Sequence, residues 1–96
     1  MDSQLYSEKV KDIALSCSYI TSYSTAYYLY WYRQYPSSSP KYILHKANKG
    51  HYSNTEPFAL NKFESELSSN STTLRIMDIN LEDSALYICA LSEDTV

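Results

Sequence analysis

The chain has 96 residues and a formal net charge of −3, with charges of both signs interspersed. This length suits one domain with a single core, and the lack of a basic stripe argues against nucleic acid or anionic membrane as a partner. Eleven tyrosines favour β-strands and, where they fall in loops, recognition, whereas a single glycine is unusual for a β domain. No signal peptide follows Met1 and no apolar run could cross a bilayer, so we expect any anchor to come from sequence absent here.

The first third of the chain predicts an edge segment, a strand and a loop. Residues 1–9 alternate weakly, which predicts a frayed and shortened edge. Residues 12–19 alternate cleanly and predict a strand, with Ile13, Leu15, Cys17 and Tyr19 on one face. Residues 20–28 are rich in Tyr, Ser and Thr without periodicity or charge, a composition typical of recognition loops.

A second strand, residues 29–35, has an outer face that is unusually aromatic. Its alternation sends Leu29, Trp31 and Arg33 inward. A solvated sheet face should be polar, so tyrosines on the outside predict a surface that a partner covers. Scattered surface tyrosines on a monomer are the alternative. The candidate interface residues are Tyr30, Tyr32, Gln34, Pro40, Tyr42 and Ile88, with Tyr28 on the same face.

The rest of the chain predicts turns and short strands. Strands are expected at residues 41–46, within 58–67 and at 73–79, the last with Leu74, Ile76 and Ile79 inward. Turns are expected at 36–40, within 45–55 and at 68–72, where Asn70 begins a glycosylation sequon whose occupancy the sequence leaves open. A helical turn at 80–84 precedes a last strand whose period places Ala85, Tyr87 and Cys89 on one face.

Three features together resemble the variable domain of a T-cell receptor alpha or delta chain. They are the run DSALYICALSE, the run LYWYRQYP, and the spacing Cys17, Trp31, Cys89. The resemblance extends from Lys11 to Glu93 and implies an all-β immunoglobulin V-type sandwich of two antiparallel sheets, with residues 1–96 as one domain. No Phe-Gly-x-Gly segment follows Cys89, so we expect the family's last strand to be missing.

The resemblance also implies what holds the core. Cys17 and Cys89 would form one inter-sheet disulfide, which stabilises by about 4 kcal/mol in the chain-entropy model and implies an oxidising, extracellular location. Two reduced core cysteines remain the alternative. Tyr87 fits the tyrosine corner, in which the hydroxyl bonds upstream backbone. Lys62 replaces the family's arginine opposite Asp83, so that ion pair loses its bidentate fork. The core residues expected are Trp31, Tyr87, Leu74 and Ile76.

The resemblance implies pairing with a second variable domain, of beta or gamma type, and recognition of a peptide presented by a major histocompatibility molecule or of another ligand. The loops expected to contact it lie near residues 22–28, 46–52 and 90–96. The residues assigned to them are Ser22, Tyr23, Ser24, Thr25, Tyr27, Tyr28, Lys46, Asn48, Lys49, His51, Tyr52, Ser92, Glu93 and Asp94.

Other functions are weakly supported. His45 and His51 lie near one turn, but no cysteine, Gly-rich loop or paired carboxylate accompanies them, so we expect surface loop histidines, no metal, no cofactor and no catalysis. Lys46, Lys49 and His51 form a small positive patch, which is either solvated or a contact for an acidic partner. A self-associating adhesion module and an antibody light-chain variable domain remain alternatives, and the sequence does not separate alpha from delta.

Overall fold

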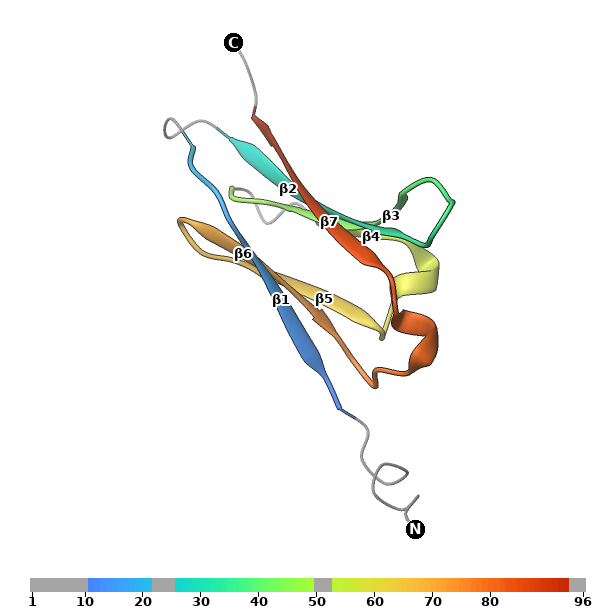
Figure 1. Cartoon of the computed structure of the whole chain (residues 1–96). Coiled ribbons are helices and arrows are strands. Elements are labelled where there is room, and N and C mark those ends of the chain that lie inside the picture. Colours follow the sequence, from blue (N-terminus) through green and yellow to red (C-terminus); the bar gives the residue numbers. More distant parts are fainter. Residues whose placement is uncertain (1–10, 22–25, 50–52, 94–96) are drawn as a thin grey trace.

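The computed structural model describes residues 11–21, 26–49 and 53–93, and these form two antiparallel sheets. The first has the order β1-β6-β5 and the second the order β4-β3-β2-β7. The two sheets stack as layers (Figure 1), as expected for a β-sandwich. The strands are β1 (Ile13–Ser18), β2 (Tyr27–Gln34), β3 (Lys41–Ala47), β4 (Ser53–Thr55), β5 (Phe63–Leu67), β6 (Ser71–Ile76) and β7 (Leu86–Glu93), with short 3₁₀ turns η1 (Pro57–Ala59) and η2 (Leu81–Asp83).

The core lies between the two sheets and is built from alternate strand residues. Trp31 is 2% exposed, and Leu74 and Ile76 of β6 are fully buried, as expected from the sequence. Ile43, Leu44, Ala59 and Phe63 complete the same cluster. Period-2 alternation explains most of this arrangement, since each strand turns one face toward the other sheet. Ile43 and Leu44 are consecutive and both buried because β3 bulges at this point.

A disulfide between Cys17 of β1 and Cys89 of β7 joins the two sheets. Its sequence separation is 72 residues, so it closes most of the described chain into one loop. Trp31 is the register partner of Cys89, and its indole Nε1 donates a hydrogen bond of 3.2 Å to Thr72 Oγ1 on the opposite sheet. Thr72 is in turn the register partner of Cys17, so Cys17, Trp31 and Cys89 meet at one place in the core.

Several strand limits differ from those expected. The strand expected at residues 73–79 is β6, which begins at Ser71 and ends at Ile76, because Asp78 adopts a positive φ of 52° that no extended strand accommodates. The strand expected from Leu29 begins at Tyr27. Ile13 lies on the same face as Leu15, as expected, and lines a depression with Ile76 and Tyr87, but it is 39% exposed because β1 is an edge strand. The edge expected at residues 1–9 lies outside the described residues.

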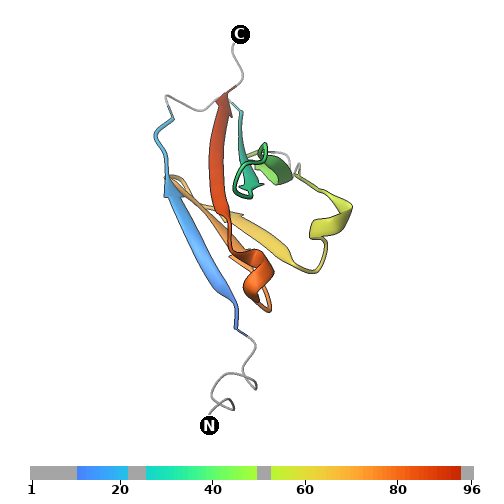
Figure 2. The same ribbon diagram turned by 45° about the vertical axis from the view of Figure 1, so that its right-hand side comes forward.

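The strands run so that several of their ends meet at one end of the sandwich. β1 and β7 run upward in the views of Figures 1 and 2, and β2, antiparallel to β7, begins where β7 finishes, with Tyr27 opposite Glu93. Tyr28 lies opposite Ala47, the last residue of β3. We call this the loop end, defined by Ser18, Tyr27, Ala47 and Glu93, and the other the base.

Candidate functional site

The outer face of the four-stranded sheet carries a continuous group of aromatic side chains. In β2 the buried Trp31 alternates with Tyr30 and Tyr32, which are half-buried and point the other way. Register places Tyr42 and Ile88 on either side of Tyr32. We define the aromatic face as Tyr28, Tyr30, Tyr32, Tyr42, His45 and Ile88.

The rings of the aromatic face are held in contact with one another. Tyr30 is central: its ring centroid lies 6.4 Å from that of Tyr32 in a stacked pair, 6.3 Å from that of Tyr42 and 4.7 Å from that of His45. The rings of Tyr32 and Tyr42 meet edge to face at 6.1 Å. Aromatic pairs at such distances contribute about 0.5–1.5 kcal/mol beyond the area they bury, so the face is ordered before anything covers it.

Hydrogen bonds at the edge of the sheet fix the same group. The Tyr42 hydroxyl shares a hydrogen bond of 2.6 Å with His45 Nδ1. The side-chain amide of Asn54 in β4 donates to the Tyr42 oxygen over 3.0 Å. The Tyr42 side chain is therefore held both by contacts of its ring and by hydrogen bonds of its hydroxyl.

His45 lies in β3 on the aromatic face, which corrects the expectation of a surface loop histidine. It is only 9% exposed, and this burial lowers its pKa. The turn-rich run that begins at His45 favoured a loop, but β3 continues through this residue. A bulge sets the face on which its side chain lies: Trp31 pairs with Leu44 but Tyr32 pairs with Tyr42, so Ile43 is an extra residue and the alternation changes phase. His51 lies outside the described residues, and within the described ranges no group of three or more potential metal-binding side chains occurs.

The margin of the aromatic face nearest the base holds Gln34, Leu86 and Pro40. Gln34 Nε2 donates to the carbonyl oxygen of Ser38 over 2.8 Å, which fixes the orientation of the amide. Leu86, opposite Gln34 in register, is 60% exposed and was not among the candidate interface residues, although its even spacing from Ile88 was a usable signal. Pro40 is exposed and lies just before β3, outside the strand.

The structure corrects the placement of Tyr27 at the loop end. Tyr27 was assigned to the first recognition loop, but it belongs to β2 and is 7% exposed. Its amide donates to Asn48 Oδ1 over 2.8 Å, and its hydroxyl lies 3.1 Å from that of Tyr19. Burial raises the pKa of Tyr19, whose hydroxyl also donates to the carbonyl oxygen of Ser68. Tyr27 thus anchors the first loop, and Ser22, Tyr23, Ser24 and Thr25 lie outside the described residues.

Two other loop assignments also change. Lys46 lies within β3, and its Nζ donates to the carbonyl oxygen of Ser65 on the other sheet over 2.7 Å, so it is a bridge between sheets and no part of a positive loop patch. Ser92 and Glu93 belong to β7, paired with Tyr28 and Tyr27. The structure keeps Asn48 and Lys49 directly after β3, whereas His51, Tyr52 and Asp94 lie outside the described residues.

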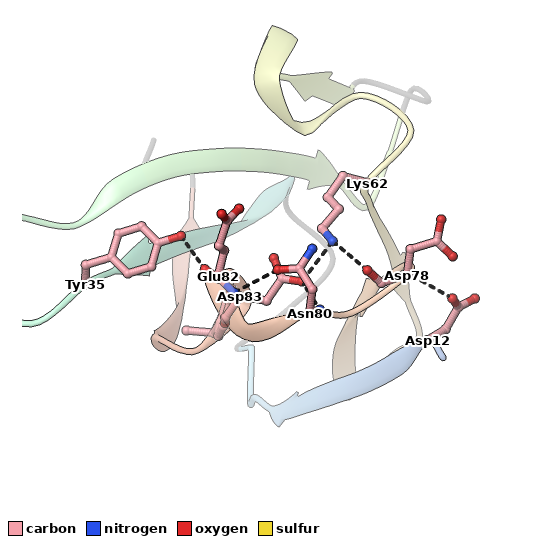
Figure 3. Close-up of polar contacts among 8 residues, drawn as sticks. Asp12, Tyr35, Lys62, Asp78, Asn80, Glu82 and Asp83 are labelled. Carbon is pink, nitrogen blue, oxygen red and sulfur yellow. Dashed lines mark hydrogen bonds and ion pairs between the residues drawn. The ribbon is translucent and has the colours of Figure 1, made fainter. Parts of the chain in front are cut away.

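A polar network at the base fixes the entry of β7. Lys62 Nζ lies 2.8 Å from Asp83 Oδ2, the ion pair expected from the sequence, and also donates to the carbonyl oxygen of Asp78. The same Asp83 oxygen accepts from the backbone N–H of Asn80. The side-chain oxygen Oδ1 of Asn80 accepts from the backbone N–H of Glu82, and η2 begins with a capping box (Figure 3). Tyr35 donates to the Glu82 carbonyl oxygen over 2.6 Å.

Two sheets joined by a disulfide beside a buried tryptophan define an immunoglobulin-type domain. A family model for the immunoglobulin V-set domain matches residues 6–96, and the chain belongs to this family, as an antigen-receptor variable domain. No helix in the described ranges is long and apolar enough to cross a membrane.

The chain is similar to several variable regions of T-cell receptors. Human T cell receptor beta variable 11-2 is 35% identical over 86 residues, which are 88% of this chain and 71% of that protein. Human T cell receptor alpha variable 38-2/delta variable 8 is 34% identical over 84 residues, 86% of this chain and 69% of that protein. Human T cell receptor alpha variable 8-6 is 34% identical over 94 residues, 96% of this chain and 78% of that protein.

Proposed function

We propose that this chain is the variable domain of a T-cell receptor alpha or delta chain, exposed outside the cell. It pairs through its aromatic face with a second variable domain of beta or gamma type. The pair then presents the loop end to a ligand, with peptide bound to a major histocompatibility molecule as the first candidate. The observation that carries this proposal is the ordered aromatic face on the outside of the four-stranded sheet.

The composition of the aromatic face favours an interface. Tyrosine is enriched among the residues that dominate binding energy at protein interfaces, and charged residues are depleted from interface cores. The described outer positions of β2 and β7 around Tyr32 are Tyr28, Tyr30, Gln34, Ile88 and Ala90, all uncharged. The contacts among the rings also reduce the side-chain entropy that is lost on binding.

The course of the strands favours the loop end as the place for a ligand. Residues 18 and 27 bound the first loop segment, 47 and 53 bound the second, and β7 finishes beside both. Loops gathered at one end of a rigid sandwich are the arrangement that binding sites commonly use. The role proposed is binding rather than catalysis.

A self-associating adhesion module is the second candidate, because the same aromatic face could bury itself against a copy of the chain in an isologous dimer. The two functions differ in the partner that covers the face. An antibody light-chain variable domain has less support, since the relatives reported above are T-cell receptor regions.

Pairing is tested by titrating the purified chain against beta-type and gamma-type variable domains and measuring affinity by calorimetry and mass by light scattering. A 1:1 heterodimer is expected, and Tyr32→Glu should weaken it at least about 100-fold, because a charge would be buried without a partner. The matched control is Ser18→Glu, an exposed position on the other sheet, which should leave affinity unchanged. If the chain instead forms a homodimer that Tyr32→Glu abolishes, the adhesion module is supported. If Tyr32→Glu and Ser18→Glu weaken the heterodimer equally, an interface on the aromatic face is refuted.

A further inference from the structure

The turn between β5 and β6 carries a sequence motif that the pairing and loop functions do not use. Of the five asparagines in the chain, only Asn70 is followed by any residue but proline and then Ser or Thr. Asn70 is exposed in this turn. Its Oδ1 accepts a hydrogen bond of 3.3 Å from Ser68 Oγ, and its Nδ2 has no hydrogen-bond partner within the described residues.

The position of the turn is fixed by its neighbours at the loop end. The Tyr19 amide donates to the Asn70 carbonyl oxygen over 3.0 Å, and Tyr19 lies just before the first loop segment. Ser68 and Ser69 line an open depression of about 570 Å³ together with Tyr27 and Asn48, which flank the first and second loop segments. A group attached to Asn70 would therefore stand beside both.

We infer that Asn70 carries an N-linked oligosaccharide, and that this sugar covers the flank of the loop end beside β5 and β6. A ligand would then have to approach over the ends of β2, β3 and β7. The site of attachment is independent of the proposed function, whereas the restriction on the ligand rests on it.

The chemistry requires a lipid-linked oligosaccharide diphosphate as donor and the transferase of the secretory pathway. A bond forms between Asn70 Nδ2 and the anomeric carbon of the sugar, while the bond from that carbon to the diphosphate oxygen breaks. The lipid diphosphate leaves with the electron pair, and Nδ2 loses one proton to a base of the transferase. The product is a glycosylated amide, bulky and exposed on the surface.

The structure also indicates when the transfer occurs. Thr72, the third residue of the motif, is fully buried in β6, and its hydroxyl accepts from the Trp31 indole. Once the sandwich has formed, that hydroxyl is not available to a transferase. The sugar is therefore attached before the two sheets close.

The test uses the full chain secreted from mammalian cells with its paired variable domain, analysed by intact mass and by peptide mapping after amidase treatment. We expect the wild-type chain to carry a glycan mass, and the amidase should remove it and convert Asn70 to Asp. Asn70→Gln should lack this mass, whereas Thr72→Ser should retain it. Equal masses for the wild type and Asn70→Gln would overturn the site. The bacterially produced, folded chain should accept no sugar from purified transferase, whereas the reduced and unfolded chain should; transfer to the folded chain would overturn the order of events.

The restriction on access is tested with a panel of antibodies raised against the loop end of the unglycosylated chain. Antibodies whose binding is lost on substitution of Ser69 should bind the glycosylated chain at least tenfold more weakly than they bind Asn70→Gln. Antibodies that depend on Ser92, which is exposed near the end of β7 and does not line the depression, should bind both proteins equally. Equal binding of the first group to both proteins would overturn the restriction. Pairing is measured separately, so failure of the proposed function and failure of this inference can be distinguished.

Discussion

The hydroxyl of Tyr87 donates a hydrogen bond of 2.6 Å to the carbonyl oxygen of Asp83, four residues upstream. This contact holds η2 against the start of β7, the strand that brings Cys89 to the disulfide and Ile88 to the aromatic face. Burial and then the charge of Asp83 raise the pKa of Tyr87, so the hydroxyl keeps its proton over the range in which proteins fold.

Tyr87→Phe should lower the free energy of unfolding by about 1 kcal/mol, the usual net value of a hydrogen bond. For a domain of this size that corresponds to a fall of about 4–8 °C in Tm. The matched control is Tyr35→Phe, which also removes a bond of 2.6 Å to a backbone carbonyl but at an exposed site. Calorimetry should show the smaller loss for Tyr35→Phe, and equal losses would contradict a special role for Tyr87.

The ion pair between Lys62 and Asp83 should be worth more than a surface pair, because the Asp83 side chain is 5% exposed. Lys62→Met should therefore lower the free energy of unfolding by about 1–3 kcal/mol, the range for a buried group that loses its hydrogen-bond partner. Lys62→Arg should stay within about 1 kcal/mol of the wild type, since it keeps the charge and restores the fork. Urea unfolding measures both, and an unchanged midpoint for Lys62→Met would show that the capping box alone satisfies Asp83.

Thr72→Val should cost about 1–3 kcal/mol, because it leaves the buried Trp31 N–H without an acceptor. Thr72→Ser keeps the hydroxyl and should lose less. The intrinsic fluorescence of Trp31, the only tryptophan, reports its surroundings during unfolding. If Thr72→Val and Thr72→Ser unfolded at the same denaturant concentration, the hydrogen bond would contribute nothing to stability.

Acidification should weaken both the fold and the pairing through His45. Its pKa is lowered from 6.5 by burial, so the unfolded state binds more protons than the folded state below pH 6.5. Stability from this group is then fully present above pH 6.5 and is lost as the pH falls toward the folded pKa. The aromatic rings packed against it belong to Tyr28, Tyr30 and Tyr42.

A pH series of unfolding and pairing measurements between pH 7.5 and pH 5 tests this. The wild type should lose stability and affinity through the lower half of that range, and His45→Gln should flatten both curves there. A wild-type curve parallel to that of His45→Gln would contradict the assignment.

Most of the central framework could be predicted from the sequence, since the signals were local or had a fixed spacing. Cys17, Trp31 and Cys89 stand at family spacing, and the period of β2 separates Trp31 from the outward tyrosines. The Tyr87 contact follows from its position two residues before Cys89.

The residues whose positions were predicted wrongly are placed by pairing between segments that are distant in the sequence. A bulge that no local pattern marks moved His45 onto the aromatic face. Tyr27 was predicted to lie in a loop because Ser, Thr and Ala precede it, but its pairing with Glu93 extends β2. The contact of Lys46 with Ser65 and the ion pair of Asp12 with Arg75 both require the register of separate strands, which periodicity alone does not supply.

Chemical footprinting of tyrosines tests the central claim most directly. The chain is nitrated alone and in complex with a beta-type variable domain, and each tyrosine is quantified by mass spectrometry, with the exposed Tyr35 at the base as internal reference. We predict that Tyr30, Tyr32 and Tyr42 become severalfold less reactive in the complex, while Tyr35 is unchanged. Equal reactivity of these three tyrosines in the free and bound chain would contradict an interface on the aromatic face.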